Sequence, residues 1–78
     1  MADEISTLMN QSKDKSLLLR LRNNKTVKGT LIDFDVHMNL TLTDAEDISG
    51  EESLQLGKIL LRGDNILAIS LPEEGSNS

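Results

Sequence analysis

Three residues whose side chains could do chemistry alternate within one short stretch of the chain. Asp35, His37 and Asn39 lie in DFDVHMNLTLTD, residues 33–44, and His37 is the only histidine. If this stretch is a strand, its geometry places the three side chains on one face. Each is an admissible oxygen or nitrogen ligand, so the three could form a metal site. A lone histidine in a strand can equally be a structural or surface residue.

The residues available do not favour a catalytic or metal centre. One histidine together with an amide is a poor ligand set for a metal ion, and the chain has no cysteine. Asp33 and Asp35 alternate onto one face, yet no serine is paired with a plausible base and nothing else supports acid–base chemistry. We therefore expect a non-enzymatic protein without metal or cofactor.

The size of the chain limits how its fold can be stabilised. Its 78 residues form one domain, and such a chain buries only about 60% of the surface that its unfolded form exposes. Domains this small usually need a disulfide, a metal or partner subunits. Because cysteine is absent, oligomerisation is the favoured support. No apolar run approaches the roughly 20 residues of a membrane span, and the N-terminus opens with acids, so we expect a cytoplasmic location.

The charge is unevenly distributed along the chain. The net charge of −5 argues against a nucleic-acid partner at first sight. However, residues 44–52 carry five acids and no base, and Glu73 and Glu74 add two more. Six of the eight basic residues lie between Lys13 and Lys28. Much of the acidity thus lies apart from the rest of the chain, which is slightly basic. The acidic stretch 44–52 is either a solubilising loop or a partner-selecting surface.

The hydrophobic pattern predicts one short helix followed by five short strands. Ile5, Leu8 and Met9 have helical spacing over residues 3–11, with Asp3 as N-cap, and a helix this short must dock on the rest of the fold. Alternation and turn residues predict strands within residues 16–22, 25–36, 38–44, 53–63 and 64–72, an Asn-Asn turn at 23–24, an exposed loop at 45–52 and a disordered acidic tail at 73–78. In the third strand Met38, Leu40 and Leu42 point inward. Gly29 inside the second strand indicates a sharp bend.

The last two strands are too apolar to leave a whole face in water. Their side chains include Ile59, Leu60, Leu61, Ile66, Leu67, Ile69 and Leu71. As free sheet edges they would be templates for aggregation, and pairing with another subunit removes those edges. Local rules alone would make Arg62-Gly63-Asp64-Asn65 a tight hairpin turn, with the arginine salt-bridged, whereas a ring requires the two strands to diverge.

Two stretches resemble the Sm/Sm-like (Lsm) family of RNA-binding ring proteins. VKGTLIDFDVHMNLTLTDAED, residues 27–47, is similar to the family's Sm1 motif, and GKILLRGDNILAIS, residues 57–70, is similar to its Sm2 motif. The archaeal branch fits best, because the His-Met-Asn and Arg-Gly-Asp-Asn forms are present. The bacterial host-factor branch is disfavoured, because its Tyr-Lys-His motif is absent. The resemblance covers residues 1–72 as a single Sm-like domain.

This resemblance implies a mainly β fold and a particular assembly. The expected fold is a short N-terminal helix followed by a strongly bent, five-stranded antiparallel open barrel. Subunits would join into a closed ring, most often a heptamer, by pairing the fourth strand with a neighbour's fifth strand. The ring then requires the last two strands to diverge.

The same resemblance implies a base-binding slot on two loops at the pore of the ring. His37 and Arg62 would sandwich one base, and Asn39 would read the Watson–Crick edge of uracil. Asp64 would orient Asn39 or Arg62, and Gly63 would allow a close backbone approach.

Asp35 and Met38 would support the slot. The implied function is a ring subunit that holds single-stranded uridine-rich RNA, one base per subunit, in RNA processing or ribonucleoprotein assembly with possible processing proteins. The lysines and arginines between residues 13 and 28 would then be a solvated face or a further RNA contact. The alternative is a scaffold subunit of a larger particle with little direct RNA binding.

Overall fold

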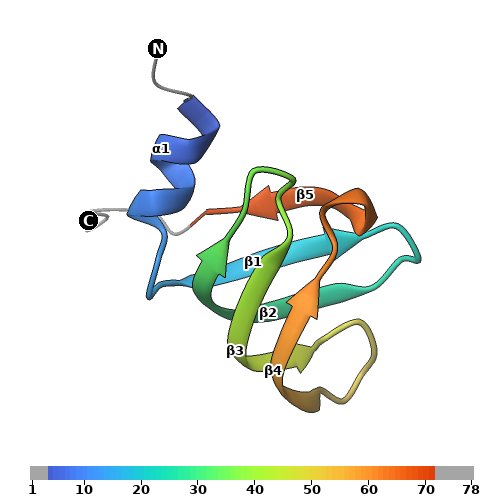
Figure 1. The fold of residues 1–78 in the computed structure, drawn as a ribbon. Helices are drawn as coiled ribbons and strands as arrows, with labels where there is room; N and C mark the ends of the chain where they lie inside the picture. Colours follow the sequence, from blue (N-terminus) through green and yellow to red (C-terminus); the bar gives the residue numbers. More distant parts are fainter. Residues whose placement is uncertain (1–3, 72–78) are drawn as a thin grey trace, which may run out of the picture.

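The computed structural model describes residues 4–71 of the chain, a short helix followed by five strands in one bent sheet (Figure 1). The predicted N-cap Asp3 and the predicted tail at 73–78 lie outside the described residues. The elements are α1 (Glu4–Gln11), β1 (Ser16–Leu21), β2 (Thr26–Phe34), β3 (Leu40–Asp47), β4 (Leu54–Leu61), a 3₁₀ turn η1 (Gly63–Asn65) and β5 (Ile66–Ser70).

The helix docks through one residue of its predicted apolar stripe. Met9 is buried in the core, whereas Ile5 and Leu8 keep 57% and 43% of their surface exposed. Ser12, just after the helix, is buried, and its hydroxyl donates to the Leu8 carbonyl at 2.8 Å. With eight residues, α1 is far too short to cross a bilayer, and the stretch 4–71 holds no longer helix.

The sheet carries its last two strands on opposite edges. The strand order is β4-β3-β2-β1-β5, and every neighbouring pair is antiparallel. Consequently β4 and β5 do not form the hairpin that local rules favour at residues 62–65, and η1 carries the chain from one edge to the other. The bent five-stranded sheet and the divergence of the last two strands are therefore confirmed.

Gly29 allows β2 to bend against β3. The β2–β3 register shifts between Lys28 and Thr30 and again between Leu31 and Asp33, and such irregularities increase local twist. A Cβ atom on Gly29 would stand only 3.2 Å from the Cβ of Leu42. The missing side chain thus gives β3 the room to cross close to β2.

Two of the sequence-based boundaries are wrong. Residues 35–39 are not part of a strand but form the loop between β2 and β3, so the proposed single strand face through Asp35, His37 and Asn39 does not exist. Hydrogen bonds from the loop backbone to Asp35 take the place of inter-strand hydrogen bonds there. At the other end of β3, residues 45–47 belong to the strand rather than to an exposed loop, and Ala45 is fully buried.

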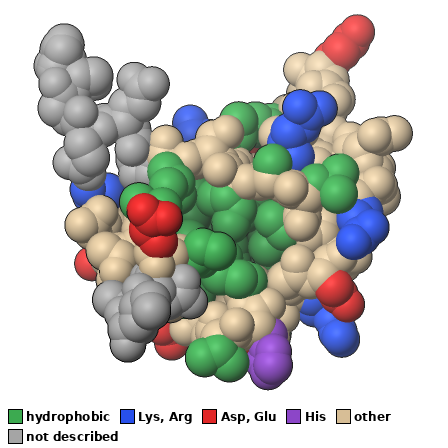
Figure 2. Space-filling model, turned by 90° about the horizontal axis from the view of Figure 1, so that it is seen from above, with side chains coloured by type: hydrophobic (Ala, Val, Ile, Leu, Met, Phe, Trp, Pro, Cys, Tyr) green, Lys and Arg blue, Asp and Glu red, His purple; other side chains and the backbone are tan. Residues whose placement is uncertain are grey.

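The buried core comes entirely from α1 and the first three strands. Its members are Met9, Leu17, Leu19, Val27, Leu31, Leu40, Leu42 and Ala45. No described residue of β4 or β5 is fully buried, and Leu54, Leu60 and Leu67 keep 62–69% of their surface exposed. A hollow of about 350 Å³ opens between α1 and β5 (Figure 2). The two edge strands thus leave much of their apolar surface uncovered.

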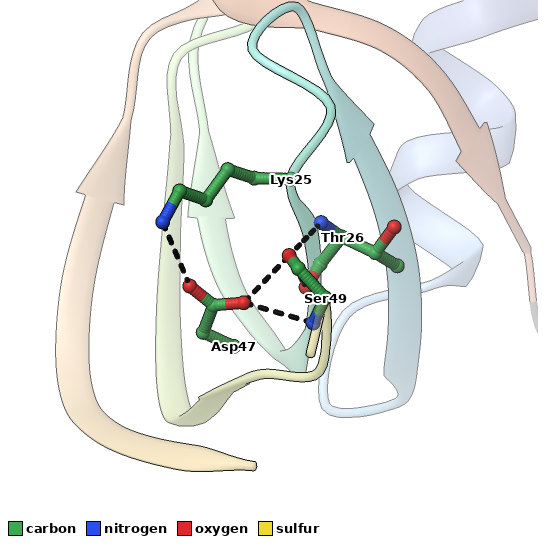
Figure 3. Close-up of polar contacts among 4 residues, drawn as sticks. All are labelled: Lys25, Thr26, Asp47 and Ser49. Carbon is green, nitrogen blue, oxygen red and sulfur yellow. Dashed lines mark hydrogen bonds and ion pairs between the residues drawn. The ribbon is translucent and has the colours of Figure 1, made fainter. Parts of the chain in front are cut away.

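A compact polar cluster ties the β3–β4 loop back to the start of β2 (Figure 3). The Asp47 carboxylate accepts from the Ser49 hydroxyl at 2.6 Å and from its N–H at 3.0 Å. The Lys25 ammonium lies 3.5 Å from the other carboxylate oxygen, and the Thr26 N–H donates to the Ser49 hydroxyl at 2.7 Å. The Ser49 hydroxyl, the Ser49 N–H and then Lys25 hold the pKa of Asp47 below its usual 3.8.

Replacing Asp47 with asparagine tests this cluster through acid stability. A depressed pKa means that the carboxylate stabilises the fold above the unfolded-state pKa, and that this stabilisation disappears as pH falls through the folded-state value. We expect Asp47→Asn to lower the free energy of unfolding at pH 7, and the gap to the wild type to close below about pH 4. Denaturant titrations followed by circular dichroism measure this difference. Glu51→Gln, in the exposed part of the same loop, is the control, and a gap that does not vary with pH would contradict the assignment.

Candidate functional site

The loop at residues 35–39 is organised by one carboxylate. Asp35 Oδ1 accepts the backbone N–H groups of His37 and Asn39, both at 2.9 Å. The Met38 N–H donates to the Asp35 carbonyl at 3.0 Å, and Met38 has the left-handed φ of 63°. A non-glycine residue in this region is uncommon and requires support from its surroundings. Here the Asp35 hydrogen bonds and the packing of Met38 against the core supply that support.

The Asn39 side chain joins this loop to the turn after β4. Its Nδ2 donates to Asp35 Oδ2 at 3.0 Å, and its Oδ1 accepts the Gly63 N–H at 2.8 Å. A carboxylate demands a donor and an N–H demands an acceptor, so this pair of partners fixes which way the amide points. One N–H and one lone pair of the amide remain without a partner within this network.

Gly63 lies directly against the backbone of the β2–β3 loop. A Cβ atom built on Gly63 would collide with the His37 carbonyl oxygen and would stand 3.0 Å from the Met38 carbonyl carbon. Only a residue without a side chain fits there, and this contact is with backbone, which cannot rotate away. The close approach expected at Gly63 is therefore present.

These contacts create an open hollow of about 620 Å³ between the two loops. Its lining residues are His37, Met38, Asn39, Arg62, Gly63 and Asp64. The structure thus brings together every residue predicted for the slot, although the two segments are more than 20 residues apart in the chain. Asp35 does not line the hollow but accepts hydrogen bonds from His37 and Asn39, which do.

The two charged side chains at the hollow pair with each other. Arg62 Nε lies 3.7 Å from Asp64 Oδ1, and the two side chains are 75% and 72% exposed. An ion pair this exposed is weak, so the guanidinium stays available to a ligand. Of the two partners predicted for Asp64, it takes Arg62, while Asn39 is held by Asp35 instead.

The Asp35 carboxylate serves the loop instead of forming the metal triad considered from the sequence. The N–H of Asn39, then the side-chain amide of Asn39, then the N–H of His37 lower the pKa of Asp35 below its usual 3.8. Both oxygens are turned toward these donors. Between residues 4 and 71, no group of three histidine or acidic side chains is placed to hold a metal ion.

Sequence reasoning missed one residue that contacts this site. Arg22, in the turn between β1 and β2, hydrogen-bonds to the β4–β5 turn through its backbone N–H and its side chain. The two positions are more than 40 residues apart, and no local motif marks the contact. Only the strand order, which places β1 beside β5, brings these turns together.

The fold is that of Sm-like proteins. The LSM domain model matches residues 7–71 of the chain. An Sm-like protein of Pyrococcus abyssi is 44% identical over 75 residues, which cover 95% of this chain and all of that protein. The chain therefore belongs to the LSM (Sm-like) family.

Two solved structures illustrate the likeness in three dimensions. The P. aerophilum SmAP1 heptamer superposes with a TM-score of 0.82 at 37% identity, covering 94% of this chain and 97% of that one. A P. abyssi Sm protein in complex with a uridine heptamer superposes with a TM-score of 0.78 at 39% identity, covering 91% of this chain and 100% of that one.

Adding one methyl group at Gly63 tests the contact between the loops. We expect Gly63→Ala to push the β4–β5 turn away from the His37 carbonyl and to lower the free energy of unfolding by about 1–3 kcal/mol, as over-packing does. Gly50→Ala is the matched control, because a Cβ there meets nothing within 4 Å. Thermal or denaturant unfolding followed by circular dichroism compares the two. Equal stability of the two variants would mean that the turn relaxes freely.

Proposed function

We propose that this chain is the subunit of a heptameric ring that holds single-stranded, uridine-rich RNA at its pore. The observation that carries the proposal is the hollow in which His37, Arg62 and the fixed Asn39 amide converge from two loops. Membership of the LSM family and the similarity to a uridine-bound relative support it. The RNA-binding residues are His37, Asn39, Arg62, Gly63 and Asp64, supported by Asp35 and Met38.

The exposed sheet edges favour self-association. β4 pairs only with β3 and β5 only with β1 within the described residues, so each has one free edge. Leu60 on β4 and Leu67 on β5 are 69% and 62% exposed. Pairing β4 of one subunit with β5 of the next covers both edges, and such head-to-tail contacts form a ring if the rotation closes. The heptameric assembly of the P. aerophilum relative favours seven subunits.

The slot suits a flat nucleobase. The His37 imidazole makes no hydrogen bond within the described residues and is exposed, so its face is free to stack. The Arg62 guanidinium on the other side of the hollow supplies a second planar surface. Stacking on such groups contributes roughly 1–3 kcal/mol per base and does not depend on base identity. Stacking therefore supplies affinity for single strands in general.

Base identity is read by Asn39. Uracil presents the acceptor O4 beside the donor N3–H on its Watson–Crick edge. The remaining N–H of the Asn39 amide can donate to O4, and its remaining lone pair can accept from N3–H. The bonds of the amide to Asp35 and Gly63 prevent it from flipping. Adenine places a donor where uracil has O4, so the fixed amide disfavours it.

Repetition gives the ring its affinity. One exposed slot binds a base weakly, but seven slots that take successive nucleotides of one strand act at high effective concentration. The Arg62 side chains would form a positive collar around the pore, although the subunit carries a net charge of −5. Binding is therefore expected to weaken as salt rises.

Native mass measurement tests the ring. We expect the wild type to be a heptamer at micromolar concentration, and Leu67→Glu to yield smaller species because it buries a charge at the β5 edge. Val36→Glu is the control, since Val36 is 91% exposed on the β2–β3 loop and belongs to neither edge strand. A monomeric wild type would contradict the proposal.

Binding to oligo-uridine and oligo-adenosine tests the slot. We expect His37→Ala to weaken binding of both oligomers, whereas His37→Phe retains much of the affinity because it keeps a stacking face. Asn39→Ala should abolish the preference for uridine. Fluorescence anisotropy with labelled oligomers measures these affinities at two salt concentrations. Equal wild-type affinity for the two oligomers would remove the role of Asn39, and a ring that binds neither would favour the scaffold alternative.

A further inference from the structure

Arg22 reaches from the β1–β2 turn to the far side of the β4–β5 turn. Its backbone N–H donates to the Asn65 carbonyl at 2.9 Å, and its side-chain Nε donates to the Asp64 carbonyl at 2.5 Å. Figure 1 shows the two turns side by side, next to the start of β5. Arg22 itself is exposed and is not part of the hollow that forms the slot.

The β4–β5 turn depends on such external bonds. η1 has no side-chain cap at its start, and its own bonds run from the Asn65 N–H to Arg62 and from the Ile66 N–H to Gly63. Asn39 holds the turn at Gly63, on the side facing the slot. Arg22 holds it at residues 64–65, on the opposite side. The turn that carries Arg62 is therefore clamped between two partners.

We propose that Arg22 is a positioning residue for the base slot. This inference rests on the proposed function. With the Arg22 side chain in place, the Gly63 N–H points at Asn39 Oδ1, and Asn39 keeps the orientation that reads uracil. Without it, only the Arg22 backbone bond to Asn65 holds that side of the turn, and the position of Arg62 relative to the Asn39 amide becomes less fixed.

A direct contact between Arg22 and an RNA phosphate is the competing explanation. The guanidinium has five N–H donors, and its bond to the Asp64 carbonyl uses only one. A phosphate contact contributes to affinity but carries no sequence information. The two explanations therefore differ in base selectivity: loss of a phosphate contact weakens all strands alike, whereas loss of positioning lowers the preference for uridine.

The experiment compares Arg22→Met with Arg20→Met in the assembled ring. Both substitutions remove one positive charge from an exposed arginine, and Arg20 makes no side-chain hydrogen bond within the described residues. Methionine at position 22 keeps the backbone bond to Asn65 and removes the side-chain bond to Asp64, because its side chain has no N–H donor. Affinities for oligo-uridine and oligo-adenosine are measured for the wild type and both variants, with native mass spectrometry as the check on assembly.

We expect Arg22→Met to leave the ring intact and to reduce the ratio of oligo-uridine to oligo-adenosine affinity roughly tenfold, as for loss of a charge-assisted hydrogen bond. Arg20→Met should leave that ratio unchanged. An unchanged ratio in Arg22→Met overturns the inference, whether or not overall affinity falls, and loss of the ring would make Arg22 an assembly residue instead. If the wild type shows no preference for uridine, the proposed function fails; if the wild type and Arg22→Met share the same preference, only the Arg22 inference fails.

Discussion

The hydrogen bond from the Gly63 N–H to Asn39 Oδ1 is the contact on which the candidate site depends. It joins the β2–β3 loop to the β4–β5 turn, and it exists because Gly63 has no Cβ to strike the His37 carbonyl. The Asp35 carboxylate completes the arrangement by holding the other end of the amide. A small barrel without a disulfide thus gains a defined polar surface from a few charge-assisted bonds rather than from a large core.

The same sheet order that forms the site leaves the chain incomplete as a single subunit. β1 must lie beside β5 for Arg22 to reach the β4–β5 turn, and this order also places β4 and β5 at opposite edges. Their leucines remain exposed, because within residues 4–71 no further strand pairs with the outer edge of β4 or of β5. The strand order therefore explains both the two-loop site and the uncovered edges, which the proposed ring would cover with neighbouring subunits.

Sequence alone predicted the elements well where local chemistry decides them. The helix, the alternating strands and the Asn24 turn, with φ of 63°, follow from patterns of a few residues, and two motifs correctly indicated the family. It failed at residues 35–39, because alternation of polar and apolar residues resembles a strand even where side chains bond to the loop backbone. The roles of Asp35 and Arg22 depend on bonds whose partners only the folded chain brings together.

The acidity of the chain does not contradict a polyanionic ligand, because the fold separates the charges. The β3–β4 loop carries Glu51 and Glu52, and Asp47 and Ser49 bind that loop to the start of β2. The candidate hollow lies between the β2–β3 loop and the β4–β5 turn, at the other ends of β3 and β4. Since charges farther apart than about 8–10 Å are largely screened at physiological salt, the distant acidic loop contributes little to the field at the hollow. The charges nearest a bound strand there are those of Arg62 and Asp64.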